Sequence, residues 1–347
     1  MRIGSPKQSY AADEALFRTP TQWTWFAILL VSLALYPFMA DQYWLYLACL
    51  ISINIISATG LNILTGYTGQ VSLGQAAFMG VGAYTVAWLD THTGAPFFVN
   101  LLAGAGMATV AGVIFGLPSL RVKGLYLAIA TIAASFILQF VFINWESVTR
   151  GMRGMNIDPP QVMGTALADP DQFYWLVVPI MVVMVLGAAN LFRTRIGRAF
   201  IAIRDRDISA SVLGIHLPTY KLMSFAIASF YAGMAGGLWA YFFGAINPES
   251  FPLLMSIFLL AAIIVGGMGT ILGGILGAIF MTLTPEALRY GVDLLSPFIE
   301  DASVILSPVR TMVFGLLIVG FLLFEPHGLA EIWRRVRRFF HLWPFRN

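Results

Sequence analysis

The sequence carries very little charge. Only 11% of its 347 residues are Asp, Glu, Lys or Arg, whereas 59% are hydrophobic, and the mean hydropathy is +0.80. Soluble domains usually carry about 25% charged residues. Between Arg18 and Arg121 the only charged side chains are those of Asp41 and Asp90. No water-soluble fold tolerates so long an uncharged stretch, so the sequence predicts an integral membrane protein.

The residues that usually form metal, disulfide and nucleotide sites are also scarce. Cys49 is the only cysteine and lies within an apolar run, which excludes disulfides and cysteine-based metal sites. His92, His216, His327 and His341 are scattered without metal-ligand spacing. No glycine–lysine pair occurs, so the chain lacks a P-loop, and any ATP must bind a partner. Because no nucleophile, base and orienting group come together, we expect no catalytic residue, metal or cofactor in this chain.

Long apolar segments dominate the rest of the chain. Most approach the length of about 20 residues that a membrane-spanning helix needs, and strands of a barrel would be shorter and would alternate in polarity. The clear candidates are residues 23–40, 43–64, 76–89, 97–117, 125–143, 173–192, 222–243 and 311–324. A further apolar run, 255–283, is interrupted by glycines. The expected fold is an all-α polytopic transmembrane helix bundle with about 8 to 10 spans, two of its segments being broken or re-entrant.

The positions of lysine and arginine predict the orientation in the membrane. If the N-terminus is cytoplasmic, only Arg150, Arg153, Arg289 and Arg310 fall in outer segments. Positively charged residues accumulate on the cytoplasmic side, so we expect both termini there. The predicted organisation is a cytoplasmic N-terminal tail over residues 1–22, a single transmembrane domain over 23–329 and a basic cytoplasmic C-terminal tail over 330–347.

Glycine-rich stretches interrupt two of the apolar segments. The first break, residues 65–74, reads TGYTGQVSLG, and the second break, residues 266–270, reads GGMGT. The spacing of Gly66, Gly69 and Gly74 recurs at Gly266, Gly269 and Gly274. Glycine-interrupted helices in corresponding halves of a membrane protein indicate a transport pathway. The arms on either side are short, so full crossings and re-entrant segments both fit.

The breaks supply the candidate pathway residues. These are Gly66, Gly69, Gln70, Ser72, Gly74, Gln75, Gly266 and Gly269. The side chains of Gln70, Ser72 and Gln75 are too polar to face lipid, so we expect them to border protein or water. Free amides and helix ends at the first break could face a carboxylate. Glycines also allow helices to pack closely, and this alternative remains open, above all for the second break.

The segment 193–221, on the predicted cytoplasmic side, combines charge with a short apolar stripe. Ile208, Val212 and Ile215 share one helical face. The alternating charges of Arg204, Asp205, Arg206 and Asp207 come directly before it, and Gly214 suits the end of a helix. Such a helix docks onto a soluble partner or lies among lipid headgroups. The interleaved aspartates favour a protein partner.

The charged residues in the rest of the chain limit the possible functions of the protein. The arginine cluster at Arg334, Arg335, Arg337 and Arg338 is expected to contact membrane lipid rather than nucleic acid. The predicted spans contain no buried ionisable residue of the kind that proton-coupled carriers use. An autonomous sodium-coupled secondary transporter remains an alternative, because broken helices can bind ions through their carbonyl groups.

Long stretches of the chain resemble the permease subunits of branched-chain amino-acid ABC transporters, specifically the LivM type. They are GLNILTGYTGQVSLGQAAFMGVGAY at 60–84, GRAFIAIRDRDISASVLGIHLPTYKLMSFAIASFYAGMAGGL at 197–238 and FEPHGL at 324–329. The resemblance covers roughly residues 23 to 329. It implies an importer subunit in the bacterial plasma (inner) membrane.

The resemblance also implies partners. They are a homologous LivH-type permease, two cytoplasmic ABC ATPases that bind the ATP, and a periplasmic or lipid-anchored binding protein that delivers leucine, isoleucine or valine. A coupling helix within 198–215 is expected in an ATPase cleft, with Arg204, Asp205, Arg206, Asp207, Ile208, Val212 and Gly214 at the contact. The outer loop 146–160 departs from the family pattern at Arg150 and Arg153. A related permease for urea or another small neutral solute is therefore the alternative.

Overall fold

The computed structural model describes residues 20–162, 165–167, 169–295 and 328–342, together with a few positions between 312 and 323. The predicted N-terminal tail lies almost entirely outside the described residues. So do half of the residues of the predicted span 311–324 and residues 343–347 of the C-terminal tail.

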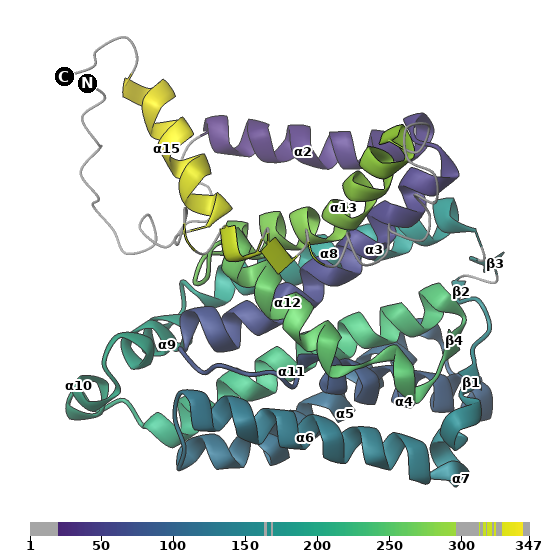
Figure 1. Cartoon of the computed structure of the whole chain (residues 1–347), viewed down its shortest axis with the longest axis horizontal. Coiled ribbons are helices and arrows are strands. Elements are labelled where there is room, and N and C mark those ends of the chain that lie inside the picture. The colour runs from purple at the N-terminus through teal and green to yellow at the C-terminus, as the bar shows by residue number, and fades with distance from the viewer. Residues whose placement is uncertain are drawn as a thin grey trace.

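The described chain is a helix bundle with a few two-residue strands (Figure 1). The elements of its first half are α2 (Pro20–Met39), α3 (Gln42–Leu61), the π-helix η1 (Asn62–Tyr67), α4 (Gln75–Thr93), α5 (Phe97–Gly116), η2 (Leu117–Leu120), α6 (Leu125–Asn144), α7 (Glu146–Thr149) and η3 (Gly151–Arg153). The strands β1 (Met155–Asn156), β2 (Gln161–Val162) and β3 (Thr165–Ala166) follow. The second half contains α8 (Pro170–Leu191), α9 (Arg195–Asp205), α10 (Asp207–Val212), α11 (Leu217–Phe243), β4 (Ala245–Ile246), η4 (Pro248–Ser250), α12 (Leu253–Gly266), α13 (Ile271–Leu295) and α15 (Leu329–Leu342). Strand β1 pairs antiparallel with β4, and β2 with β3.

Within the described residues, seven helical segments are long and apolar enough to cross a membrane. They are Gln42–Tyr67, Phe97–Leu120, Leu125–Asn144, Pro170–Leu191, Leu217–Phe243, Pro248–Gly266 and Ile271–Tyr290. A shorter apolar helix covers Trp23–Met39. The prediction of an all-α polytopic bundle is confirmed. These seven segments establish neither the predicted span count nor a re-entrant segment, and α4, which forms at the predicted span 76–89, is not among them.

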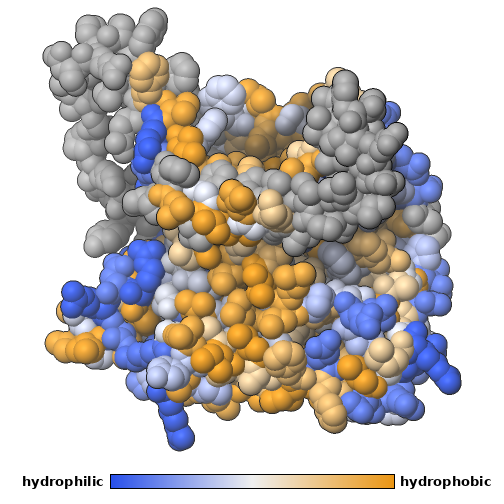
Figure 2. Space-filling view, viewed as in Figure 1, coloured by the Kyte–Doolittle hydropathy of each residue, from blue (hydrophilic) through white to orange (hydrophobic). Residues whose placement is uncertain are grey.

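The helices run side by side, and the short elements gather at the two ends of the bundle. Figure 1 shows α9 and α10 at one end, and β1, β4 and α7 at the opposite end. The space-filling view in Figure 2 shows hydrophilic side chains towards these two ends, with hydrophobic ones between them. Large apolar side chains are exposed here, for example Phe136 and Phe140 on α6 and Ile114 on α5. A lipid-facing belt explains this pattern, because soluble proteins rarely expose so large an apolar surface.

Helix α11 lies in the centre of the bundle, where small residues let its neighbours approach. A Cβ atom at Gly236 would overlap the carbonyl oxygen of Met79 on α4. A Cβ at Gly82 on α4 would lie 2.5 Å from the Gly233 backbone of α11. The small residues of α11 therefore act as packing residues, as expected where lipid supplies no hydrophobic driving force between helices.

Candidate functional site at the two breaks

The first break lies at the same end of the bundle as α9 and α10. Helix α3 continues as the buried π-helix η1, a rare geometry that often marks functional positions. The Tyr67 ring at the end of η1 stacks on Phe192, directly after α8, with 3.4 Å between ring centroids. The chain then turns through residues 68–74 into α4. The break is therefore a turn between two helices.

The second break joins α12 to α13 and comes close to the first. Gly267 and Gly269 have φ angles of 114° and 75°, a region that favours glycine. A Cβ at Gly328, just before α15, would lie 2.5 Å from the Gly267 nitrogen. The second break thus lies between the first break and the beginning of the C-terminal helix.

The side chain of Asn62 joins the two breaks. Its Oδ1 accepts a hydrogen bond from the Gly269 N–H at 2.9 Å, and its Nδ2 donates to the Thr270 carbonyl at 2.7 Å. A Cβ at Gly66 would overlap Asn62 Oδ1 and lie 2.5 Å from the Gly269 nitrogen. Gly66 is therefore small because the opposite break packs against it. Sequence analysis missed Asn62, although an amide one helical turn before Gly66 in an apolar run was a usable signal.

Arg204 connects the end of α9 to both breaks. Its Nη1 donates to the Gly66 carbonyl at 3.1 Å, and a Cβ at Gly269 would lie 2.6 Å from the same nitrogen. Its Nε pairs with Asp205 at 3.2 Å. Arg204 lies in the segment 193–221, which we call the predicted coupling segment. Its side chain therefore contacts the backbone of both breaks.

The polar candidate residues at the first break lie inside the bundle, and the amides of Gln70 and Gln75 bond to other helices. Gln70 Nε2 donates to Ser224 Oγ on α11 at 2.7 Å, and Gln75 Nε2 donates to the Ser57 carbonyl on α3 at 3.0 Å. The Ser72 hydroxyl accepts from the Gly74 N–H at 3.3 Å. All three side chains are almost fully buried, so they border protein here. Of the three, Gln70 alone lines a described cavity.

The remaining candidate glycines serve close packing. A Cβ at Gly266 would overlap the Gly273 carbonyl of α13, and one at Gly74 would lie 3.3 Å from the Thr131 carbonyl of α6. Gly69 is exposed, has a φ of 72° and packs against Arg204. The structure thus brings Gly66, Gly69 and Gly269 together around Arg204, but not Gly74 or Gly266.

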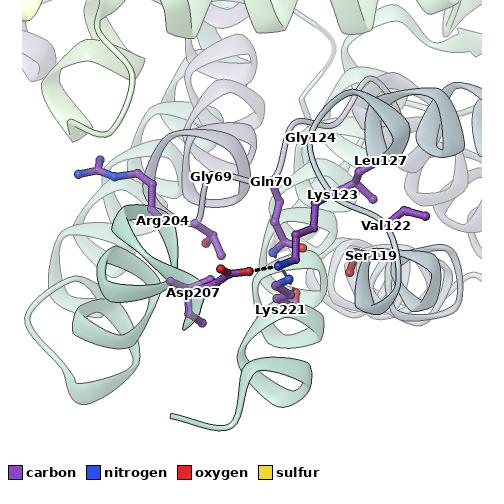
Figure 3. A pocket seen from close by; sticks show the side chains of 12 residues that line it. Gly69, Gln70, Ser119, Val122, Lys123, Gly124, Leu127, Arg204, Asp207 and Lys221 are labelled. Carbon is purple, nitrogen blue, oxygen red and sulfur yellow. Dashed lines mark hydrogen bonds and ion pairs between the residues drawn. The ribbon is translucent and has the colours of Figure 1, made fainter. Parts of the chain in front are cut away.

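A small cavity adjoins the first break. Its volume is about 90 Å³, and Figure 3 shows the side chains around it. It is lined by Thr68, Gly69, Gln70, Ser119, Val122, Lys123, Gly124, Leu127, Ile203, Arg204, Asp207 and Lys221. Lys123 forms an ion pair with Asp207, and the hydrogen bond from its ammonium lowers the pKa of the Asp207 carboxyl. This pair joins the segment before α6 to the beginning of α10.

A short helix, α10, forms where the sequence predicts the coupling helix, and α9 precedes it. Helix α9 buries Phe200 and Ile203, whereas Ile208 and Val212 on α10 are 74% and 83% exposed. Gly214, with a φ of 86°, follows the end of α10. An apolar helix face is therefore exposed at the end of the bundle, connected through Arg204 to the breaks.

Comparison with known proteins identifies the family of the chain. Residues 43–322 match the family described as branched-chain amino acid transport system / permease component. The chain is 32% identical over 340 residues to the high-affinity branched-chain amino acid transport system permease protein LivM of Escherichia coli (strain K12), covering 91% of this chain and 76% of that protein. It is 31% identical to LivM of Salmonella typhimurium, covering 89% and 74% of the two chains.

Similarity extends to the second permease type. LivH of Salmonella typhimurium is 26% identical over 278 residues, which cover 70% of this chain and 86% of that protein. No solved structure was found to match. The family match over most of the chain shows that this protein belongs to the permease components of branched-chain amino acid transport systems.

Proposed function

We propose that this permease forms the translocation pathway of an ABC importer for branched-chain, aliphatic amino acids together with a LivH-type permease. Two cytoplasmic ATPases drive it, and a periplasmic or lipid-anchored binding protein delivers the substrate. Both termini are cytoplasmic, in a bacterial plasma (inner) membrane. This orientation needs an even number of spans, which are the seven long apolar segments, α2, α4 and the span that the sequence predicts at 311–324. The observation that carries the proposal is the contact of Arg204 with Gly66 and Gly269, because it joins the exposed α9–α10 segment to both breaks.

The position of α10 supports the ATPase as its partner. Ile208, Val212 and Leu213 expose a short apolar surface flanked by charges of both signs. Apolar residues surrounded by a polar rim are typical of a protein interface. In this arrangement α10 enters an ATPase cleft, and Arg206 and Asp207 lie at its edge.

Coupling follows from the contacts of α9. When the ATPases close, α9 and α10 move with them, and the hydrogen bond from Arg204 carries that displacement to the Gly66 carbonyl. The Asn62 amide then transmits it to the second break. A displacement that separates the breaks opens a route for a zwitterion whose aliphatic side chain suits the apolar walls.

Reconstitution tests the proposal and separates it from the sodium-coupled alternative. We expect leucine uptake into proteoliposomes that contain both permeases, both ATPases and the binding protein, and we expect it to require ATP. Uptake by this chain alone on a sodium gradient would contradict the proposal. Uptake of urea in place of leucine would keep the importer and overturn the substrate class.

A substitution at Arg204 tests the coupling step. In Arg204→Gln, ATP hydrolysis by the complex is expected to persist while leucine uptake falls at least tenfold, because the link to Gly66 is lost. Arg195→Gln is the matched control, since it removes an exposed arginine from the first turn of α9, at the opposite end of that helix from Arg204. Equal uptake in the two variants would contradict the role of Arg204.

A further inference from the structure

The cavity beside the first break joins segments that are distant in sequence. In Figure 3 the side chains of Gln70, Lys123, Asp207 and Lys221 point towards one centre, whereas the Arg204 guanidinium points away from it. These residues come from the turn before α4, the segment before α6, and the beginnings of α10 and α11. A cavity of about 90 Å³ holds a small anion but not an amino acid with an aliphatic side chain.

The charges around the cavity do not balance. Lys221 is 6% exposed, and among the described residues its ammonium has no hydrogen bond or salt bridge. Asp207 is the carboxylate that acts electrostatically on Lys221, but it already pairs with Lys123. Two ammonium groups therefore share one carboxylate. Because the carboxylate of Asp207 is already paired, the excess of positive charge at the cavity favours a further negative charge there.

Two buried oxygen atoms of residues that line the cavity also lack partners in the described chain. They are Gln70 Oε1 and Ser119 Oγ, on side chains that are 5% and 1% exposed. Buried polar atoms in folded proteins are nearly always hydrogen-bonded. The Ser119 hydroxyl can donate to an anion, and Gln70 Oε1 accepts a hydrogen bond. An oxyanion that keeps one O–H can accept a hydrogen bond from Ser119, donate one to Gln70 Oε1 and pair with the Lys221 ammonium.

We propose that this cavity binds a small oxyanion that retains an O–H group, such as hydrogen phosphate or bicarbonate. The Lys221 ammonium supplies the counter-charge, Ser119 donates a hydrogen bond, and Gln70 accepts one from the anion. The bound anion joins the first break to η2 and to the beginning of α11, so it stabilises the C-terminal end of the segment 193–221 in the position seen here. This site does not depend on the identity of the transported solute.

The test uses the full-length chain, purified alone in lipid nanodiscs. Its thermal unfolding midpoint is followed against phosphate and, separately, bicarbonate, at constant ionic strength with gluconate as the reference anion. We expect either anion to raise the midpoint with saturation, and formate, which lacks an O–H at neutral pH, to act more weakly. The anion with the lower half-saturating concentration is the natural occupant of the two.

Variants test whether the anion raises the unfolding midpoint by binding in this cavity. Lys221→Met should raise the half-saturating concentration at least about tenfold, the loss expected for one charge-assisted hydrogen bond. Ser119→Ala should raise it by a smaller factor, and Arg195→Gln, which removes an exposed positive charge elsewhere, should leave it unchanged. The proposal is overturned if the wild-type midpoint does not respond to either anion beyond gluconate. It is also overturned if Lys221→Met responds like the wild type, whatever its own stability.

Discussion

At the residue scale, the side chain of Asn62 connects the two breaks. It is 2% exposed, and both ends of its amide bond to the second break. Its partners, Gly269 and Thr270, lie more than two hundred positions away in the sequence. No local pattern predicts such a pair, because contacts at this separation depend on the fold of the whole bundle.

Removal of the Asn62 amide should weaken the contact between the two breaks. We predict that Asn62→Ala lowers the free energy of unfolding by about 2–4 kcal/mol, since two hydrogen bonds are lost and buried backbone groups stay unpaired. The measurement is the unfolding midpoint in a mild detergent under increasing denaturant. Asn144→Ala is the control, because Asn144 is exposed and its amide bonds, within the described part of the chain, only to the Phe140 carbonyl one turn earlier. A cost as small as that of the control would show that Asn62 does not hold the breaks together.

The sequence predicted the residue types of the site better than their contacts. Gly66 and Gly269 were identified from their spacing, and they do approach each other. Arg204 was expected at the partner surface, yet its guanidinium donates to the Gly66 carbonyl. Charge patterning shows that a residue lies outside the lipid, but not which way a long side chain turns. Whether Arg204 also contacts an ATPase stays a prediction.

At the element scale, the contact between α11 and α4 depends on glycine. We predict that Gly236→Ala strongly reduces the yield and lowers the thermal midpoint, because its methyl group overlaps the Met79 carbonyl and forces the two backbones apart. Overpacking of this kind typically costs about 1–3 kcal/mol, and more where backbone is the obstacle. Gly106→Ala on α5 is the control, since nothing lies within 4 Å of its added Cβ. Equal stability of the two variants would contradict this close packing.

The segment before α6 and the beginning of α10 are joined by the ion pair of Lys123 and Asp207. Lys123 is 63% exposed on its side chain, so the pair is worth at most about 1 kcal/mol. Because Lys123 lowers the pKa of Asp207 below its ordinary value of 3.8, the contribution is complete above that value and disappears as the pH falls through the lowered pKa.

The corresponding pH dependence is measurable. We predict that Asp207→Asn lowers stability by less than about 1 kcal/mol, by a constant amount between about pH 5 and 8. The difference from the wild type should vanish in stronger acid, where Asp207 is protonated in both states. Unfolding midpoints of the two proteins across this pH range give the comparison. A difference that changed between pH 6 and 8 would assign the effect to another group.

Helix positions were predictable because apolar runs of sufficient length leave few alternatives in a membrane. The run 43–64 forms α3 and η1, but the π-helix and its end at Tyr67 were not predicted, since nothing local distinguishes it from an α-helix. The coupling segment was expected to contain one short helix and contains two. Helix α9 was not predicted, because its many charged residues hide the apolar periodicity of the face that carries the buried Phe200 and Ile203.

At the scale of the whole molecule, the charge distribution and the fold agree. One end of the bundle holds the arginine-rich α9 and its neighbour α10 (Figure 1). The opposite end holds β1, β4 and α7, which contain no arginine. The two breaks lie with α9 and α10, in contact through Arg204 and Asn62. The sequence indicated the glycine breaks and the segment 193–221 separately, and the structure shows them in contact.

The chain is well suited to testing whether this unit borders an aqueous pathway. Cys49 is fully buried, so an introduced cysteine would be the one accessible thiol. We would place a cysteine at Gln70 in the first break or at Thr270 in the second, assemble the complete importer in nanodiscs, and measure reaction rates with a charged, membrane-impermeant thiol reagent. We predict that both positions react, that the rates differ at least tenfold between ATP-bound and nucleotide-free states, and that leucine slows them. If neither position reacts in any nucleotide state, while a cysteine at the exposed Val212 reacts in the free permease, the breaks do not border the transport pathway.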